Sequence, residues 1–552
     1  MTIYKNILYF FLLFVVITFA CDSEDDLIDD VKAETPATSD PDPLTGTAGS
    51  ADFTTYVSFG NSIAAGLMDA ALYTRGQESS FPNLMAARFA LAGGGTFDQP
   101  DINSANGFNT SLNDITNAFD PEAAVFGRFF LDLSIPGPVA TTSADPLNFV
   151  DDPSSISNLA IPGMRMIELT VEGYGTLNPF YARFTTDPTT QSVLGQGLAK
   201  APTFMTFWLG NNDVLLWASS GGSGPIGIDA MGMPDPTQDA TPNALVSTAS
   251  FDATIDGSMA ALFGTNPDLK GVILNIPNIT LIPFFQAVTW NAIPLDATTA
   301  EVSNAGYAGY NAILDALTDA ATFGPLAITQ DEADKRKISF TAGDNPIVIV
   351  DDQLTDLTTA FDFLTTVPVE MGGITAEQRA SLEPLVLARQ TKSVVQDPGL
   401  ATFGLPAEIV TLSAGSLLGT LADPDNPASV IGVGVPLGDQ FTLTTDEIGL
   451  LLSRITAFNS KIASVADTYP GLVLFDANAL FTSIAVNGGI EADGFMYAPD
   501  FSPNGIFSTD GIHPNPAGHA IVANQIMDVI ESEFGAELPA YDVTDFTTVL
   551  SQ

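Results

Sequence analysis

The sequence predicts an α/β fold built on a parallel β-sheet. Four short apolar runs have the length and the β-branched or aromatic content of buried strands. They are "FTTYVSFG" (53–60), "TFMTFWLG" (203–210), "GVILNIP" (271–277) and "GLVLFDA" (471–477).

Helical patterns separate these runs. Amphipathic or apolar stretches with helical spacing occupy 81–91, 304–320, 445–469 and 516–534. Continuous apolar strands that alternate with helices are typical of a parallel sheet covered on both faces. We therefore expect one large α/β domain with insertions.

The chain has 552 residues, of which 45% are hydrophobic, so it can fill a sizeable core. We assign residues 53–320 and 441–535 to one discontinuous domain. Residues 321–440 combine short β-like runs with a helix pattern near 376–391, and we expect them to form an insertion or cap subdomain. The end of the chain, 536–552, is expected to be a C-terminal tail.

Charge excludes one class of partner. The formal net charge is −48, from 17 Lys and Arg against 65 Asp and Glu. Such a field repels the phosphate backbone, so nucleic acid is not an expected partner. Beyond the N-terminal segment, the sequence holds no apolar run of the roughly 18 residues needed to span a bilayer.

The first residues predict export. Residues 1–20 combine Lys5 with an apolar run of signal-peptide length, and the only cysteine, Cys21, follows at once. "TFAC" resembles a lipoprotein cleavage site, with Thr18 where an aliphatic residue is usual; the alternative is an ordinary signal peptide and a buried cysteine. Residues 21–52 are acidic and poor in apolar residues, as in a disordered tether. We expect a lipid-anchored protein of the cell envelope, exposed on the outer membrane.

A serine stands where the first predicted strand ends. The run "YVSF" leads directly into "GNSIAAG" (60–66), and the flanking glycines permit a tight turn. This turn presents the hydroxyl of Ser62 at the carboxyl edge of the sheet, where α/β folds bind ligands. A serine in such a turn is more often a helix cap, and the chain has no G-x-S-x-G motif.

Three further motifs follow in order along the chain. "NLAIPGMR" (158–165) and "WLGNND" (208–213) each place small or amide side chains after a strand-like run. "DGIHP" (510–514) places a carboxylate three residues before an imidazole, a spacing at which the two side chains meet in a helix-like turn.

The ordered set resembles the SGNH, or GDSL-like, hydrolase superfamily, whose four sequence blocks supply Ser, Gly, Asn and His. The matching residues are Ser62, Gly163, Asn212, and Asp510 with His513. The resemblance covers roughly 53–535 and extends, through "SFPNLMAARF", to long lipoprotein members of the Bacteroidetes lineage. Asn61 departs from the usual Asp, and Ile63 from the usual Leu.

The resemblance implies a flavodoxin-like three-layer α/β/α sandwich and a serine ester hydrolase that needs neither metal nor cofactor. Ser62 would be the nucleophile, and His513, held by Asp510, would be its base. The backbone N–H groups of Ser62 and Gly163 and the amide of Asn212 would form the oxyanion hole.

Substrate and alternatives stay open at this point. Lipids or acylated small molecules are the first expectation, carbohydrate O-acetyl groups the second. A third is a non-catalytic surface lipoprotein that binds glycan or lipid. The aromatic run 282–293 is either part of an acyl pocket or core.

Other residues have ordinary structural explanations beside functional ones. His519 is expected to be structural, and Asp213 is expected to cap the helix after the third motif or, alternatively, to orient Asn212. The acidic pairs at 351–352 and 423–425 are possible calcium ligands, but a chain this acidic contains such pairs by chance.

Overall fold

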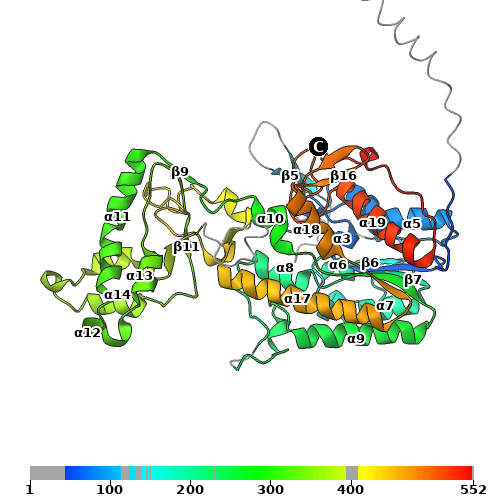
Figure 1. Ribbon diagram of the computed structural model, residues 1–552, viewed down its shortest axis with the longest axis horizontal. Coiled ribbons are helices and arrows are strands. Elements are labelled where there is room, and N and C mark those ends of the chain that lie inside the picture. Colours follow the sequence, from blue (N-terminus) through cyan, green and yellow to red (C-terminus); the bar gives the residue numbers. More distant parts are fainter. Residues whose placement is uncertain are drawn as a thin grey trace, which may run out of the picture. The chain divides into compact units, whose positions relative to one another are not determined.

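The computed structural model describes residues 44–113, 125–131, 138–144, 147, 149, 151–228, 231–392 and 408–549 (Figure 1). The expected signal peptide and Cys21 lie outside these residues. From Gly46 onward the chain forms one compact unit. Within the described ranges, no helix is both long enough and apolar enough to cross a bilayer.

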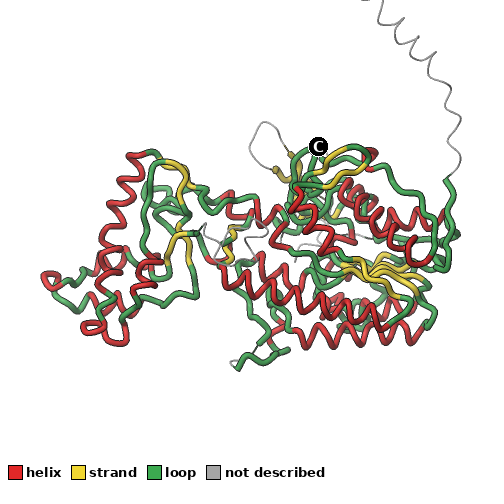
Figure 2. Tube along the Cα trace, in the orientation of Figure 1, coloured by secondary structure: helices red, strands yellow, loops and turns green. Residues whose placement is uncertain are grey.

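A five-stranded parallel sheet lies at the centre of the larger core, in the order β15-β8-β7-β1-β6 (Figure 2). This confirms the predicted α/β class and the parallel sheet. The strands are β1 (Tyr56–Gly60), β6 (Asn158–Ala160), β7 (Phe204–Trp208), β8 (Lys270–Leu274) and β15 (Leu472–Phe475).

Helices pack around this sheet in pairs. Helix α5 (Phe81–Leu91) contacts α19 (Pro516–Phe534), and both have the bounds that the sequence predicts. Helix α9 (Thr248–Thr265) contacts α17 (Thr445–Thr468), where the rings of Phe251 and Phe458 stack with centroids 3.9 Å apart. The shorter helices are α3 (Ser62–Ala65), α4 (Thr74–Glu78), α7 (Val193–Ala199), α8 (Asn212–Ser219) and α18 (Ala477–Asn487).

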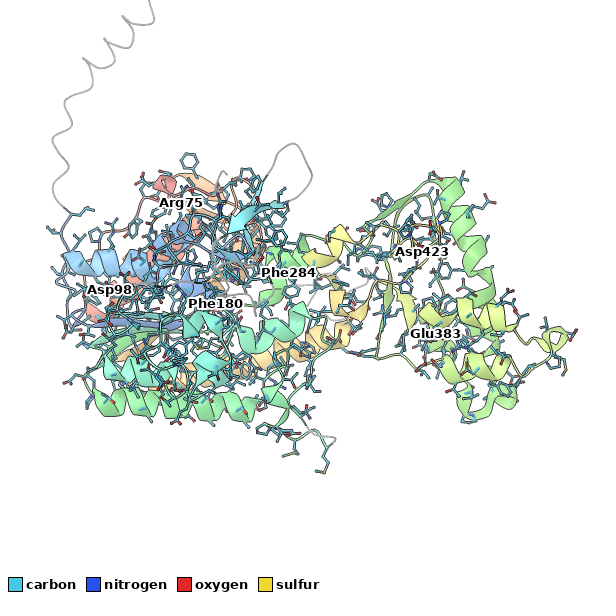
Figure 3. All side chains as sticks on the ribbon, turned by 180° about the vertical axis from the view of Figure 1, so that it is seen from behind. Arg75, Asp98, Phe180, Phe284, Glu383 and Asp423 are labelled. Atoms are coloured by element: carbon cyan, nitrogen blue, oxygen red, sulfur yellow. The ribbon has the colours of Figure 1, made fainter. Side chains whose placement is uncertain are left out.

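A second hydrophobic core begins at Ile293 and ends at Leu437. The insertion therefore starts earlier than the expected residue 321. The reason is α11 (Ala297–Ala316), which buries Tyr307 and Leu314 in this second core rather than against the sheet. Glu383 and Asp423, labelled in Figure 3, are exposed residues of the insertion.

Short elements build this insertion. The sequence predicts a single helix near 376–391, but the structure divides this stretch into three elements. They are α15 (Ala376–Ser381), a 3₁₀ turn (Glu383–Leu385) and β12 (Ala388–Gln390). The α-helix does not continue because Pro384 lacks the N–H that it would need. The insertion also contains α12 (Ala320–Phe323), α13 (Gln330–Arg336), α14 (Thr358–Leu364), β9 (Ile293–Leu295), β10 (Gly343–Asn345) and β11 (Val348–Val350). Strand β9 pairs with β10, and β11 pairs with β12.

Both ends of the described chain contact the body. Thr47 exchanges two backbone hydrogen bonds of 2.9 Å with Glu537, and the N–H of Ser50 donates to Phe534. The ordered body therefore begins before residue 53, inside the stretch expected to be a tether. The expected tail also packs, since Tyr541 donates its hydroxyl to the carbonyl of Leu84 at 2.8 Å.

Candidate active site

Ser62 lies at the start of α3, directly after the central strand β1. The side chain of Asn61 caps this helix by accepting the N–H of Ile63 at 3.2 Å. Gly60 permits the turn, because a Cβ there would lie 2.5 Å from that of Ala64. The strand and the cap thus place Ser62 in the first turn of α3.

Three of the four motifs meet at one edge because their strands are neighbours. Strand β1 lies between β6 and β7, and Gly60 pairs with Ala160 on one side and Trp208 on the other. Parallel strands in this register end at the same level, so the loops that follow them converge. The sheet order alone brings Ser62, Gly163 and Asn212 to a common edge.

The fourth motif completes a chain of hydrogen bonds. The Oγ atom of Ser62 lies 2.8 Å from Nε2 of His513. Nδ1 of the same ring lies 2.9 Å from Oδ2 of Asp510. Ser62 and His513 are both buried, each with 8% of its surface exposed. This is the geometry of a nucleophile, a base and a carboxylate that orients the base.

Asp510 is held as an anion. Burial would raise its pKa, but the His513 ring and the N–H groups of His513 and Ala70 outweigh burial and lower the pKa to about 2. Oδ1 accepts the N–H groups of Ile512 at 2.8 Å and His513 at 2.9 Å, and Oδ2 accepts that of Ala70 at 2.8 Å. A carboxylate with this many donors stays ionised and accepts a hydrogen bond from the N–H at Nδ1 of the imidazole.

Backbone N–H groups without partners among the described residues lie in the loops at Ser62 and Gly163. Within the described residues, neither the N–H of Ser62 nor that of Gly163 donates to another group. Gly163 has φ +80°, a backbone conformation that favours glycine. Space is not the reason for a glycine here, because a Cβ atom at this position would have Asn178 Nδ2, 3.9 Å away, as its nearest neighbour. Asn212 donates one amide hydrogen to the carbonyl of Met164 at 3.0 Å, which ties its side chain to the same loop.

Asp213 has a different role from the helix cap that the sequence suggests. Its Oδ2 accepts the N–H of Met166 at 2.6 Å, so it fastens the loop after β6 to the start of α8. Burial raises its pKa to about 7 against the opposing effects of the Met166 N–H and of Arg165. The sequence could not show this, because the partner lies 47 residues away.

Sequence reasoning missed a support for Asp510. Asp69 and Ala70 both have positive φ, 54° and 59°, an unusual conformation for non-glycine residues. Asp69 accepts the N–H and hydroxyl of Thr509 at 3.1 and 2.8 Å, and its own N–H donates to Oγ of Ser508 at 2.9 Å. These bonds hold the loop after α3 against the loop of Asp510, and no local pattern in the sequence announces them.

His519 is structural, as expected. It is fully buried in α19, and its Nδ1 accepts the N–H of Phe81, the first residue of α5, at 3.3 Å. Burial, with a smaller effect of His513, lowers its pKa to about 3. The ring therefore stays neutral in the folded protein.

This neutrality predicts a pH-dependent difference in stability between the wild type and His519→Gln. Between pH 6.5 and 3, an unfolded imidazole binds a proton whereas the folded one does not, so acid lowers the free energy of unfolding. The wild type should lose up to about 1.4 kcal/mol per pH unit relative to the variant. Urea unfolding of both proteins at pH 7, 5.5 and 4.5 measures the difference between their free energies of unfolding. The contributions of the other titrating groups cancel in this difference, because both proteins share them. Parallel pH profiles would contradict it.

The acidic pairs offer no metal site. Oδ2 of Asp351 lies 2.5 Å from Nε of Arg389, with which it forms an ion pair. Oδ1 of Asp423 accepts the N–H of Asp425 at 3.0 Å. Across the described residues, no group of three or more His, Cys, Asp or Glu side chains is placed to hold a metal ion.

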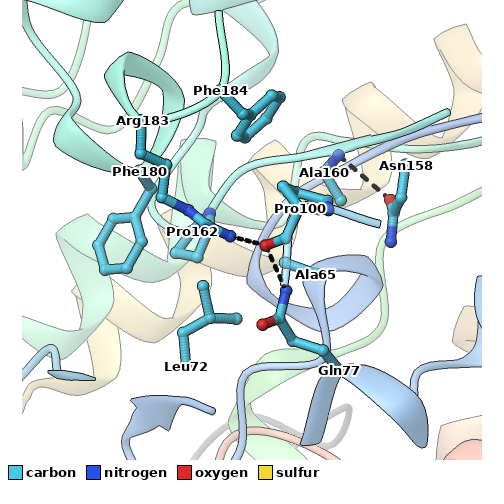
Figure 4. A pocket seen from close by; sticks show the side chains of 10 residues that line it. All are labelled: Ala65, Leu72, Gln77, Pro100, Asn158, Ala160, Pro162, Phe180, Arg183 and Phe184. Carbon is cyan, nitrogen blue, oxygen red and sulfur yellow. Dashed lines mark hydrogen bonds between the residues drawn. The ribbon is translucent and has the colours of Figure 1, made fainter. Parts of the chain in front are cut away.

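Figure 4 shows a pocket whose lining includes Ala65, the last residue of α3. Gln77 donates its amide to the carbonyl of Pro100 at 2.9 Å, and the guanidinium of Arg183 donates to the same oxygen. The remaining volume is about 0 Å³.

Comparison with known proteins does not identify a relative. No family model, no curated protein and no solved structure matches the chain.

Proposed function

We propose that this protein is a serine ester hydrolase of the SGNH or GDSL-like type, acting on lipid or other acyl esters. The observation that carries the proposal is the continuous hydrogen-bonded chain from Ser62 through His513 to Asp510. A buried carboxylate and an imidazole beside a serine at the edge of a parallel sheet activate that serine as a nucleophile.

The residues have defined roles in such a reaction. Asp510 accepts a hydrogen bond from the N–H at Nδ1 of His513, which leaves the Nε2 lone pair free to take the proton of Ser62. Ser62 attacks the ester carbonyl, His513 protonates the leaving alcohol, and an acyl-serine remains. Water then attacks it with His513 again as base, which releases the acid.

The oxyanion forms in both steps and needs donors. The N–H groups of Ser62 and Gly163 and the remaining amide hydrogen of Asn212 are suited to it, because none has another partner among the described residues. One such donor is typically worth about 3–4 kcal/mol of barrier.

A flavodoxin-like three-layer fold belongs to the same proposal. It is supported by the parallel sheet and by two separate helix pairs, α5 with α19 and α9 with α17 (Figure 1). Anchoring in the outer membrane through a lipid on Cys21 is the corresponding proposal for location, and it is supported by the N-terminal sequence alone.

Labelling with a fluorophosphonate tests the proposal directly. The reagent reacts with activated serines, so we expect one stoichiometric adduct, on the peptide that contains Ser62. Mass spectrometry locates it, and p-nitrophenyl ester turnover should fall in step with labelling. An unlabelled Ser62 in folded protein would instead favour a non-catalytic binding protein.

A further inference from the structure

The insertion contains a large hollow of its own. Its volume is about 620 Å³, and every residue that lines it lies between Leu295 and Gly434. None of these residues belongs to the four motifs. Sites that bind small molecules typically enclose about 300–1,000 Å³. The hollow therefore has room for an organic molecule of ordinary ligand size.

One face of α11, labelled in Figure 1, forms a side of this hollow. Its lining residues recur every three or four positions and so share that face; they include Thr299, Ser303, Gly306, Tyr310 and Ile313. From the first to the last of these a helix rises about 21 Å, at about 1.5 Å per residue. The hollow thus extends along most of α11.

Two tyrosines of α11 tie this helix to the other walls. The hydroxyl of Tyr307 donates to the carbonyl of Val433 at 2.6 Å, and that of Tyr310 lies 3.2 Å from the carbonyl oxygens of Leu385 and Ala388. Val433 and Leu385 themselves line the hollow. These bonds hold the walls at a fixed separation and leave neither phenolic proton free for a ligand.

The lining is uncharged and mostly apolar. It includes no Asp, Glu, Lys, Arg or His, although the chain has a net charge of −48. The exposed carboxylates of Glu301 and Glu377, each next in sequence to a lining residue, would repel an anionic group. A charged group inside would have no partner, which is costly. The hollow therefore favours an uncharged, largely apolar ligand.

We propose that the insertion binds one uncharged lipid, whose extended hydrocarbon chain lies along α11 in this hollow. The length of the lined face suits a long chain, and the uncharged walls exclude an ionised headgroup. The hydroxyls of Thr299 and Ser303 suit a headgroup that carries hydroxyls. This binding function goes beyond the proposed ester hydrolysis and uses none of its residues.

Displacement of a fluorescent dye tests the inference on the whole protein. N-phenyl-1-naphthylamine, which is uncharged and apolar, reports occupancy. It is displaced with 1-O-hexadecylglycerol, an uncharged ether lipid that an esterase does not cleave, below the concentration at which this lipid aggregates. We expect one bound lipid per protein by native mass spectrometry. Its affinity should exceed that of hexadecanoate, an anion of the same chain length, at least tenfold.

Two glycines of α11 provide variants that fill the hollow. A Cβ atom added at Gly306 or Gly309 meets no atom within 4 Å, and leucine favours a helix more than glycine does. Gly306→Leu and Gly309→Leu should each weaken lipid binding at least tenfold without lowering Tm. Gly257→Leu is the matched control, because this glycine of α9 is also exposed and has an equally open Cβ position. It should keep the wild-type affinity.

The inference is overturned if the wild type shows no saturable displacement, or if hexadecanoate binds as tightly as the ether lipid. An unchanged affinity in a folded glycine variant, or an equal loss in Gly257→Leu, also overturns it. If neither glycine variant folds, Ser303→Asp decides in the same way, since it places a charge on the same face of α11. The proposed function fails separately, through the absence of labelling or turnover that depends on Ser62.

Discussion

Replacement of Ser62 by Ala is expected to lower kcat/KM for ester hydrolysis by a factor on the order of 10⁴–10⁶, while the protein stays folded. The hydroxyl removed is the one that contacts Nε2 of His513, at 2.8 Å. Without this hydroxyl no acyl-serine forms. The rate enhancement that remains would come from substrate binding and from the proposed oxyanion donors. Initial rates with p-nitrophenyl esters measure the loss.

The stability of this variant should change little, because Ala fits the first turn of a helix whose cap is Asn61. Ser381→Ala is the matched control: it removes an exposed hydroxyl that bonds only to the carbonyl of Gln378, at 2.7 Å. That variant should keep full activity. Turnover by folded Ser62→Ala at the wild-type rate would show that the nucleophile is another residue.

Asp510→Asn is the second large effect, with an expected loss of about 10³–10⁴ in kcat. Each carboxylate oxygen of Asp510 accepts two N–H groups. Those that Oδ2 accepts come from the backbone of Ala70 and from Nδ1 of His513. An amide nitrogen at Oδ2 would face the Ala70 N–H and would force the ring to present Nδ1 as an acceptor. Nε2 would then carry the proton and could not accept that of Ser62.

The reversed amide is no better, because its nitrogen would face the N–H groups of Ile512 and His513. We also expect a loss of about 1–3 kcal/mol in the free energy of unfolding for the unpaired donors. Fluorophosphonate labelling of Ser62 and urea unfolding separate the two effects. Wild-type labelling rates in this variant would mean that Asp510 does not orient His513.

The sheet and the main helices could be predicted because their signals are local. Strands β1, β7, β8 and β15 are short apolar runs, and α5 and α19 have the spacing and caps of helices. The motif residues could be found because each follows the end of such an element. The location of Ser62 beside His513 then follows from the sheet order and from the loop before α19.

What could not be predicted depends on contacts distant in sequence. Helix α11 has an apolar face, but nothing in its pattern says which of the two cores that face joins. Asp69 and Asp213 look like ordinary acids among 65, yet each bonds to a loop far along the chain.

The separation of 451 positions between Ser62 and His513 has a consequence for biogenesis. A ribosome adds about 5–20 residues per second, so Ser62 is made roughly 20–90 s before His513. Throughout that interval the nascent chain lacks the proposed base, and a product of premature termination ahead of His513 would lack it permanently. Under the proposed function, the onset of hydrolysis would therefore report that synthesis has passed His513 and that the two distant segments have joined.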